Sequence, residues 1–347
     1  MINRSVIWLP GYGIAIAAGQ RRTLVAPQYL CLYSSEHALS SINFLESIVP
    51  RDGYKPELLN VDLTQIKGIT AAAALILFAQ VSYLKIFSGY PDIVRVIPPR
   101  DPIQKRNFFS SGLRNALSKG ASSGLDQLLT SGSAFSTSAN AAHANEHTQQ
   151  MVRERNPGIR GDVMAAATEL MLNVWHHAYD FPGGQYVVTR TGRRFWQYVV
   201  CENNSLDYLI YDRGQGIPTT LDEIYPSDES GGEPVEIELM APGANRAAYR
   251  DFIRISNAFM PGVSRSPKGG RGNGSIRIKR PVESTSSAID FDGRLSDNLL
   301  GLNYLFVLSG EGRYLYYGKE PQHDDCSWRG MCGTLVEISV PMNGIKD

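Results

Sequence analysis

Three polar side chains recur every four residues in a segment that otherwise holds good helix formers. Glu169, Asn173 and His177 lie in the stretch 165–178, which contains no Gly or Pro and follows a helix start signal at 161–162. Side chains four residues apart share one helix face, so a carboxylate, an amide and an imidazole form a row. Such a row is costly to bury without partners, which a nucleotide, a metal ion or water can supply. The alternative is an ordinary solvated helix face.

Two glycine-containing segments carry further candidate ligand contacts. Residues 206–211 alternate like a strand and lead to Asp212, after which Gly214 and Gly216 let the backbone approach a ligand closely. A carboxylate at that place accepts a hydrogen bond from an exocyclic amine. The second segment, 268–275, is a basic, glycine-dense loop of the kind that turns N–H groups towards phosphate oxygens. Its candidate residues are Lys268, Gly270, Arg271, Gly272 and Gly274.

In this order the segments resemble the motifs of the GHKL superfamily, the ATPases of gyrases, heat-shock chaperones, mismatch-repair proteins and sensor histidine kinases. Residues 169–178 look like its N box, 212–216 like its first glycine box, 270–274 like its second and 333–341 like its closing strand. The nearest branch is the histidine-kinase and anti-sigma-factor-kinase type. The resemblance implies a Bergerat-type α/β sandwich, a mixed sheet with helices on one face, that binds ATP and Mg²⁺.

The side-chain chemistry and the resemblance together suggest individual roles. Asn173 is a neutral oxygen ligand that suits Mg²⁺, which takes few protein ligands in phosphate sites. Glu169 is placed to activate an attacking water or hydroxyl, and His177 either assists it or packs structurally. By analogy with the family, Asp212 reads adenine and Thr334 is a second contact. The glycines of both boxes would shape a lid, and the cations for phosphate are Lys268 or Arg271.

A separate α/β domain is expected before these motifs. A strand at 58–63, an Ala-rich helix at 70–86, a second strand at 93–97 and a short helix at 112–118 predict a parallel sheet with a crossover. This region resembles a STAS domain, the fold of anti-sigma-factor antagonists. The residues that carry the resemblance are Val61 to Thr64, Ile69 to Ala73 and Phe108 to Leu113. In that family a Ser or Thr at the start of this helix is a phosphorylation site. Thr70 is the corresponding residue, with a plain helix N-cap as the alternative.

Composition and length divide the 347 residues into three parts. We expect the STAS-like α/β domain at 1–118, a flexible linker or partly helical tether rich in Ser, Ala and Gly at 119–157, and the GHKL-type domain at 158–347. Within the GHKL-type domain, strands are expected at 186–189, 195–200 and 302–308, with a polar, Gly-containing insertion at 290–300. The long connection at about 218–270 contains Pro, Gly and a helical pattern near 247–259. Long insertions of this kind are commonly lids.

The charge balance and the cysteine content limit which partners and which cellular compartment are expected. Thirty-four basic residues balance thirty-four acidic ones, so no net field recruits nucleic acid. Four irregularly spaced cysteines suit a reducing, cytoplasmic compartment. His323, Cys326 and Cys332 lack a fourth ligand for zinc. The apolar stretch 69–87 is broken by polar residues and predicts a buried helix rather than a membrane span. Residues 6–18 read as strand, turn and strand rather than as a signal peptide.

Two functional hypotheses follow. The first is an ATP-binding regulatory switch that hydrolyses ATP or phosphorylates a protein Ser or Thr. The second is a non-catalytic ATP-sensing scaffold whose STAS-like domain binds a protein partner. Ser275 favours the second, because the family usually has an apolar residue there. A protein partner is expected in both cases, with a homodimer as a further option.

Overall fold

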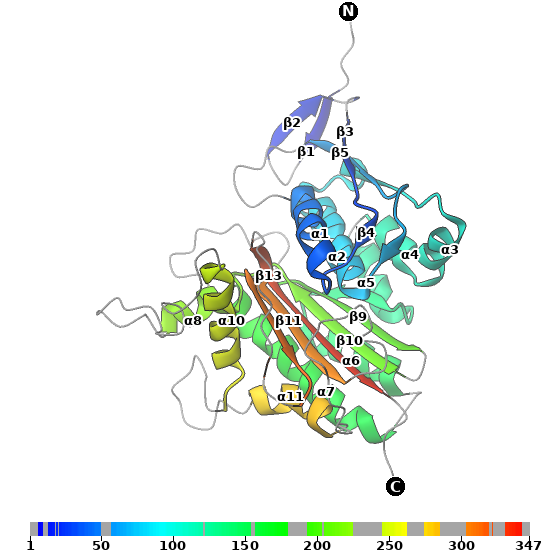
Figure 1. Ribbon diagram of the computed structural model, residues 1–347. Helices are drawn as coiled ribbons and strands as arrows, with labels where there is room; N and C mark the ends of the chain where they lie inside the picture. The colour runs from blue at the N-terminus through cyan, green and yellow to red at the C-terminus, as the bar shows by residue number, and fades with distance from the viewer. Residues whose placement is uncertain are drawn as a thin grey trace, which may run out of the picture. The chain divides into compact units, whose positions relative to one another are not determined.

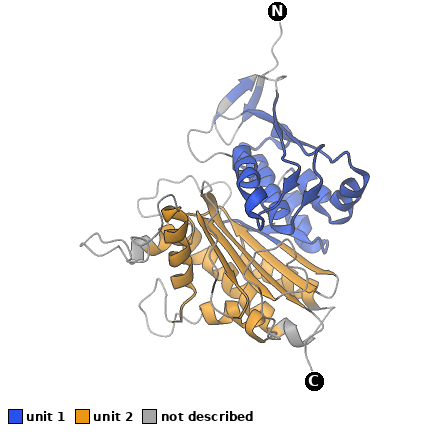
Figure 2. Cartoon of the chain, in the orientation of Figure 1, with its two compact units in different colours: residues 1–139, 186–197 blue, residues 140–185, 198–347 orange. Residues whose placement is uncertain are grey.

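The protein forms two compact units that each mix helices and strands. The computed structural model describes residues 6–9, 13–17, 19, 21–49, 57–120, 122–153, 157–179, 193–202, 205–224, 245–261, 274–284, 303–318, 321 and 330–341. The first unit is residues 1–139 with 186–197, and the second is residues 140–185 with 198–347 (Figure 2). Parallel and antiparallel strand pairs both occur, which confirms the predicted mixed α/β class.

The first unit is built on a parallel sheet with helical crossovers. Its strand order is β3-β5-β7, from β3 (Arg21–Val25), β5 (Leu58–Asp62) and β7 (Val94–Ile97). The strand–helix–strand prediction for this region is therefore confirmed. Two shorter pairs accompany it: the parallel pair β4 (Tyr29–Leu30) and β6 (Gly68–Ile69), and the antiparallel pair β1 (Val6–Leu9) and β2 (Ile14–Ala17). The helices are α1 (Ser35–Ile48), α2 (Ala71–Ser88), η1 (Pro91–Ile93), α3 (Pro102–Ser110) and α4 (Leu113–Ser118).

Helix α2 is the core helix of this unit. Thr70 caps its start by accepting a hydrogen bond from the N–H of Ala73 at 3.4 Å, and Gly89 ends it in the left-handed conformation. Among the described helices α2 alone is long and apolar enough to cross a membrane, but 78% of that window is buried inside the protein. The prediction of a buried helix is thus confirmed. Its burial extends around the whole helix rather than along one stripe.

Residues 119–157, predicted as a flexible linker or a partly helical tether, contain regular structure. They include α5 (Ser122–Thr130), β8 (Phe135–Ser138) and the whole of α6 (Ala141–Arg153). Leu125 and Leu128 of α5 are fully buried, because the apolar island within the Ser- and Gly-rich sequence packs into the unit. The unit boundary therefore falls after residue 139 rather than at 118.

A later segment completes the first unit. The Nε1–H of Trp196 donates to the hydroxyl of Ser82 on α2 at 2.7 Å, and the hydroxyl of Thr137 donates to the carbonyl of Phe195 at 2.7 Å. Both aromatic side chains are fully buried. These contacts explain why residues 186–197 belong with the first unit despite their position in the chain. The strand predicted at 186–189 lies outside the described residues.

The second unit contains a sheet with the order β12-β11-β13-β10-β9 (Figure 1). Strand β10 pairs with β13, β13 with β11 and β11 with β12, all antiparallel. The strands are β9 (Phe195–Glu202), β10 (Ser205–Asp212), β11 (Tyr304–Gly310), β12 (Gly312–Tyr316) and β13 (Met331–Pro341). The strands predicted at 195–200, 206–211, 302–308 and 333–341 are confirmed within a few residues.

Helices of the second unit gather on one face of this sheet (Figure 1). Tyr314 and Tyr316, two residues apart on β12, face the same side; Tyr314 stacks on Phe259 beside α10, and Tyr316 donates to Glu283 of α11 at 2.7 Å. Helix α7 packs against α11 and β10. The helices are α7 (Pro157–Asn173), the single π-helical turn η2 (Val174–Ala178), α8 (Ile217–Ile224), α10 (Arg246–Ala258) and α11 (Gly274–Ser284). The polar insertion predicted near 290–300 lies outside the described residues.

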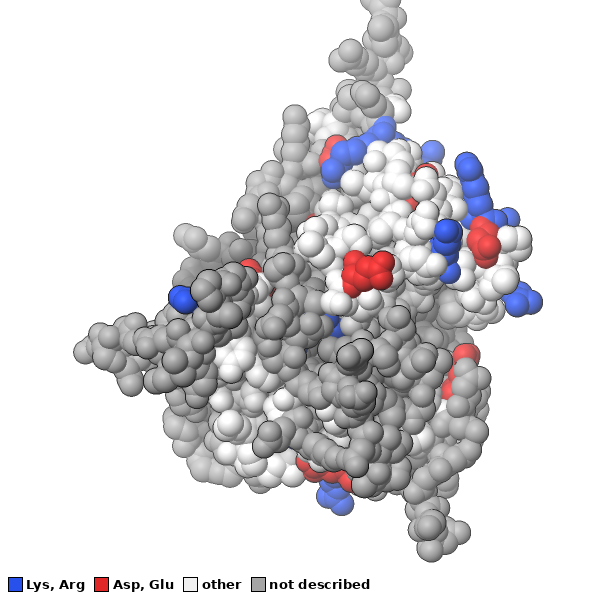
Figure 3. Space-filling model, viewed as in Figure 1, with Lys and Arg blue, Asp and Glu red and all other residues white. Residues whose placement is uncertain are grey.

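Charged side chains of both signs are interspersed on the described surface of the first unit in the face that Figure 3 shows. This distribution agrees with the equal numbers of basic and acidic residues.

Candidate functional site

The end of β10 brings two predicted site residues together. Asp212 and Thr334 are directly paired across the antiparallel β10–β13 ladder, so their side chains lie on the same sheet face. The helices cover this face, and only 4% of Asp212 and 9% of Thr334 remains exposed. We call Asp212, Gly214, Ser309 and Thr334 the strand-end cluster. Residues far apart in sequence therefore meet at one strand end.

The carboxyl group of Asp212 is perturbed by its surroundings. Burial raises its pKa to about 7, although hydrogen bonds from the backbone N–H groups of Gly214 and Thr334 lower it. The N–H of Gly214 donates to Oδ1 at 2.7 Å. A buried carboxyl group without a described cationic partner is typical of a ligand-reading position rather than of a structural ion pair.

The turn after Asp212 lies directly against the end of the preceding helical segment. The N–H of Gln215 donates to the carbonyl of Ala178, the last residue of η2, at 2.9 Å. A Cβ atom at Gly214 would overlap that same carbonyl, so only glycine fits there. Gly216 adopts a φ of +84°, a left-handed conformation that favours glycine. Both glycines of the first predicted box thus have a structural reason to be glycine.

Tyr179 extends this contact. Its hydroxyl accepts a hydrogen bond from the N–H of Arg213 at 3.1 Å. Burial, and next the nearby carboxyl of Asp212, raise the pKa of Tyr179 well above its ordinary value. The hydroxyl therefore stays protonated at neutral pH.

A second group of residues surrounds Glu169 on α7. The guanidinium Nη1 of Arg277 lies 3.6 Å from Oε2 of Glu169. Gly274, the first residue of α11, lies so close to the Glu169 carboxyl that an added Cβ atom would overlap it. Asn173, one helical turn after Glu169, is exposed. We call Glu169, Asn173, Gly274 and Arg277 the helix-end cluster. The segments predicted as the N box and as the end of the second glycine box therefore meet.

The row of residues on α7 differs from the predicted one in two ways. Helix α7 begins at Pro157 rather than near 161–162, as suits a residue with no N–H to satisfy at a helix start. After Asn173 the chain forms the π turn, whose wider winding carries His177 out of the regular four-residue row. His177 is half-buried, whereas Asn173 is exposed. Glu169 and Asn173 keep helical spacing, and His177 does not.

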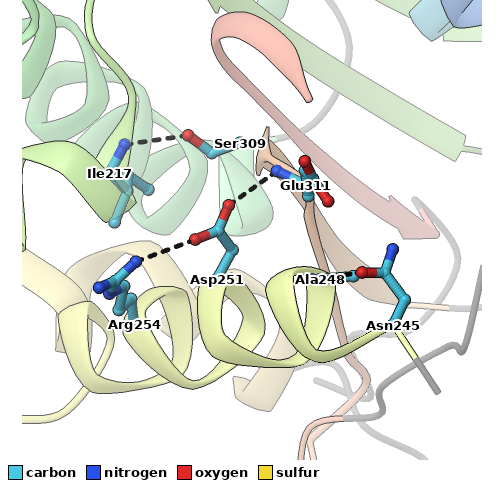
Figure 4. Close-up of polar contacts among 7 residues, drawn as sticks. All are labelled: Ile217, Asn245, Ala248, Asp251, Arg254, Ser309 and Glu311. Atoms are coloured by element: carbon cyan, nitrogen blue, oxygen red, sulfur yellow. Dashed lines mark hydrogen bonds and ion pairs between the residues drawn. The ribbon is translucent and has the colours of Figure 1, made fainter. Parts of the chain in front are cut away.

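Helix α10 contacts the strand-end cluster through the turn between β11 and β12 (Figure 4). Oδ2 of Asp251 accepts from the N–H of Glu311 at 2.8 Å, and Oδ1 lies 3.2 Å from Nη1 of Arg254. Two residues before Glu311, the hydroxyl of Ser309 accepts from the N–H of Ile217 at 2.9 Å. The region predicted as a lid thus contains α10 and nearly all of α8, and these two helices contact each other and the end of β11.

Some predicted residues lie elsewhere or outside the described chain. Lys268, Gly270, Arg271 and Gly272 are outside the described residues, as are His323 and Cys326 of the zinc alternative. Thr70 belongs to the first unit, where its hydroxyl lies 3.4 Å from the carbonyl of Leu30 while it caps α2. Ser275, the departure from the family pattern, is buried and donates to the carbonyl of Met260 at 3.2 Å.

Sequence reasoning did not identify Ser309, Tyr179 or Arg277 as contributors. A serine that follows an apolar strand is a signal for Ser309, because a buried hydroxyl needs partners. No comparable signal marks Tyr179 or Arg277, whose roles depend on the π turn and on the position of α11.

Comparison of the chain with models of known protein families gives no match, and comparison with curated proteins gives none either.

Proposed function

We propose that the second unit is a GHKL-type nucleotide-binding domain that binds ATP with Mg²⁺ and acts as a regulatory switch. The observation that carries the proposal is the buried Asp212 carboxyl, paired across the sheet with Thr334 and closed by the Gly214–Gly216 turn. The carboxyl is suited to accept from the exocyclic amine of adenine. A Bergerat-type arrangement of sheet and helices agrees with the observed layers.

One continuous helical segment connects the two clusters, which supports a single extended ligand. Glu169 lies on this segment, and Ala178, nine positions later, contacts the turn after Asp212. At 1.5 Å per residue this is about 13 Å, a span of the same order as a nucleotide triphosphate. A base at the strand-end cluster would thus place its phosphates near the start of α11, where backbone N–H groups favour negative charge.

The residues present fit Mg²⁺ held mainly by phosphate and water. Asn173 offers an exposed amide oxygen, and no group of three His, Cys, Asp or Glu able to hold a metal occurs among the described residues. Asn173 would be a protein ligand of Mg²⁺, and the bound ion would neutralise phosphate charge. In this proposal Glu169 orients or deprotonates the attacking water or a protein hydroxyl, and His177 is a weaker candidate for assistance.

The ATP-sensing scaffold is the second candidate, and the state of Glu169 favours it. The Glu169 carboxyl lies 3.6 Å from Nη1 of Arg277 and directly beside Gly274, so an attacking water would have to share the carboxyl with Arg277. ATP would then order the second unit without turnover, and the STAS-like first unit would bind a cytoplasmic protein partner or a second copy. Thr70 is the proposed phosphoacceptor, although its capping role gives its hydroxyl a structural function.

Equilibrium ATP binding tests the proposal directly. We expect Asp212→Asn to weaken Mg-ATP binding by about tenfold or more, because a neutral amide replaces the acceptor pair. Asp207→Asn is the matched control: Asp207 lies on the same strand but accepts from Ser339 at 2.6 Å on the opposite sheet face. If the wild type and Asp212→Asn bind Mg-ATP with equal affinity, Asp212 is not part of the binding site. Absence of binding would remove the nucleotide function altogether.

The fate of the γ-phosphate separates the two candidates. With labelled ATP and Mg²⁺, free phosphate that disappears in Glu169→Gln indicates hydrolysis, and label on Thr70 or on an added protein indicates a kinase. ATP that is bound but unchanged supports the scaffold. Asp162→Asn is the control, since Asp162 contacts Arg280 at 2.9 Å on the same pair of helices but lies away from Glu169.

A further inference from the structure

Ser309 places one buried hydroxyl at the junction of three polar groups. It is fully buried and pairs with Thr334 across the β11–β13 ladder. Its oxygen lies 2.9 Å from the N–H nitrogen of Ile217, 3.2 Å from the carbonyl oxygen of Gly333 and 3.0 Å from the hydroxyl oxygen of Thr334. Figure 4 shows the Ser309 side chain directed at the backbone nitrogen of Ile217.

The chemistry of these groups fixes the direction of each hydrogen bond. A hydroxyl has one proton to donate and two lone pairs to accept with. The N–H of Ile217 can only donate, and the carbonyl of Gly333 can only accept. Ser309 therefore accepts from Ile217 and donates to Gly333, and the third contact is satisfied when Thr334 donates to Ser309. If Ser309 donated to Thr334 instead, it could not donate to the carbonyl of Gly333. That carbonyl belongs to a buried residue and would lose this hydrogen bond.

Because Thr334 donates its proton to Ser309, its hydroxyl presents only oxygen lone pairs to a ligand. Its proton is committed to Ser309, and 9% of Thr334 remains exposed beside the Asp212 carboxyl. Above its pKa of about 7, Asp212 also presents only lone pairs. An exocyclic amine can donate to such a pair, whereas an exocyclic carbonyl oxygen would face oxygen lone pairs.

We infer that Ser309 is a positioning residue that holds the Thr334 hydroxyl as an acceptor and so makes the site select amino-purine over oxo-purine nucleotides. The inference rests on the proposed nucleotide site. Ser309 itself does not touch the ligand; it acts through Thr334. It therefore affects which base is bound more than how tightly phosphates are held.

Affinities for ATP and for ITP, whose base carries a carbonyl oxygen in place of the amine, test this role. Both are measured with Mg²⁺ at pH 8, where Asp212 is ionised. We expect the wild type to prefer ATP by about tenfold or more. In Ser309→Ala the Thr334 hydroxyl loses its acceptor and can rotate to donate to the carbonyl of ITP. Binding of ITP should then strengthen, and the preference should fall on the order of tenfold.

Two variants control the measurement. Thr334→Val removes the hydroxyl at similar shape, so the preference should fall without a gain in ITP affinity. Ser339→Ala, also on β13 but bonded to Asp207 on the other sheet face, should keep the wild-type preference. A gain in ITP affinity cannot result from partial unfolding, which would weaken both nucleotides.

The outcomes separate this inference from the proposed function. Equal affinities in the wild type, or an unchanged preference in Ser309→Ala, overturn the role of Ser309 while ATP binding still stands. Failure of the wild type to bind either nucleotide overturns the proposed site itself. If Ser309→Ala does not fold, Ser309→Cys replaces it, since a thiol is a weak acceptor of similar size. The same shift is expected, and an unchanged preference again overturns the inference.

Discussion

The strand-end cluster and the helix-end cluster are fixed in different ways. Asp212, Ser309 and Thr334 are almost fully buried and held by ladder pairing and short backbone hydrogen bonds. In the helix-end cluster, by contrast, Asn173 is exposed and the side chain of Arg277 is 63% exposed. Side chains at the end of hydrogen-bonded strands are held in one arrangement, whereas long side chains on two helices can adopt several conformations. The first cluster therefore suits recognition, and the second suits a step that changes during a cycle.

The largest effect that tests this contrast is expected from the buried carboxyl of Asp212. An aspartate has a pKa of about 4 in an unfolded chain, and burial raises the folded value to about 7. Between these values the folded state keeps a proton that the unfolded state loses. The free energy of unfolding should therefore fall as pH rises from about 4 to 7, by up to about 4 kcal/mol from this residue. Denaturant titrations in Asp212→Asn should show this part of the fall removed.

Asn173→Ala provides the control from the helix-end cluster. Its side chain does not titrate, so the variant should keep the wild-type dependence of unfolding on pH. Identical curves for wild type and Asp212→Asn would contradict the buried, ionisable state assigned to Asp212.

The next test compares one glycine from each cluster. An added Cβ atom at Gly214 would overlap the backbone carbonyl of Ala178, which also accepts from Gln215. Backbone must then move, and Gly214→Ala should cost about 3 kcal/mol of unfolding free energy. At Gly274 the obstacle is the end of the Glu169 side chain, which can rotate away. Gly274→Ala should therefore cost at most about 1 kcal/mol.

Thermal and denaturant unfolding of the two alanine variants measures this difference. Equal losses would show that α11 and Glu169 are as rigidly placed as the turn after Asp212. Such a result would remove the physical distinction between the clusters.

Local patterns explain why much of the strand-end cluster could be predicted from the sequence. The residue pattern of 206–211 predicted one strand and the family resemblance predicted the other at 333–341, and the roles of Asp212 and Thr334 follow only with the family resemblance. Their pairing is then a consequence of the antiparallel register. Ser309 could not be assigned in this way, because its role depends on contacts with Thr334 and Ile217, which are far from it in sequence.

The helix-end cluster was predicted less completely, because its geometry also depends on structure that no local sequence pattern indicates. Helical spacing correctly placed Glu169 and Asn173 on one face, but a π turn leaves no clear mark in composition, so His177 was misplaced. For 119–157 the structure contradicts a flexible linker and shows helices instead, because Ser, Ala and Gly also occur in short packed helices when a few leucines are buried. Tertiary packing decided both cases.

A smaller effect is expected where α10 meets the strand-end cluster. Asp251 accepts from the N–H of Glu311 at 2.8 Å and contacts Arg254. Asp251→Ala removes both interactions and should cost about 1–2 kcal/mol of unfolding free energy. Arg254→Ala, which leaves the bond to Glu311 intact, should cost clearly less. Equal costs would mean that the ion pair, and not the turn contact, holds α10 in place.

The smallest effect is expected for Arg277. Its contact with Glu169 is 3.6 Å long and its side chain is 63% exposed, so solvent screens the pair and Arg277→Ala should change unfolding free energy by at most about 0.5 kcal/mol. Arg280→Ala, which breaks the similarly exposed contact with Asp162, should behave alike in stability. The two should differ in turnover: only Arg277→Ala releases the Glu169 carboxyl, so in a hydrolysing enzyme only that variant should change phosphate release. A stability loss above about 1.5 kcal/mol for Arg277→Ala would instead make the pair a structural element, and the helix-end cluster would then be as firmly fixed as the strand-end cluster.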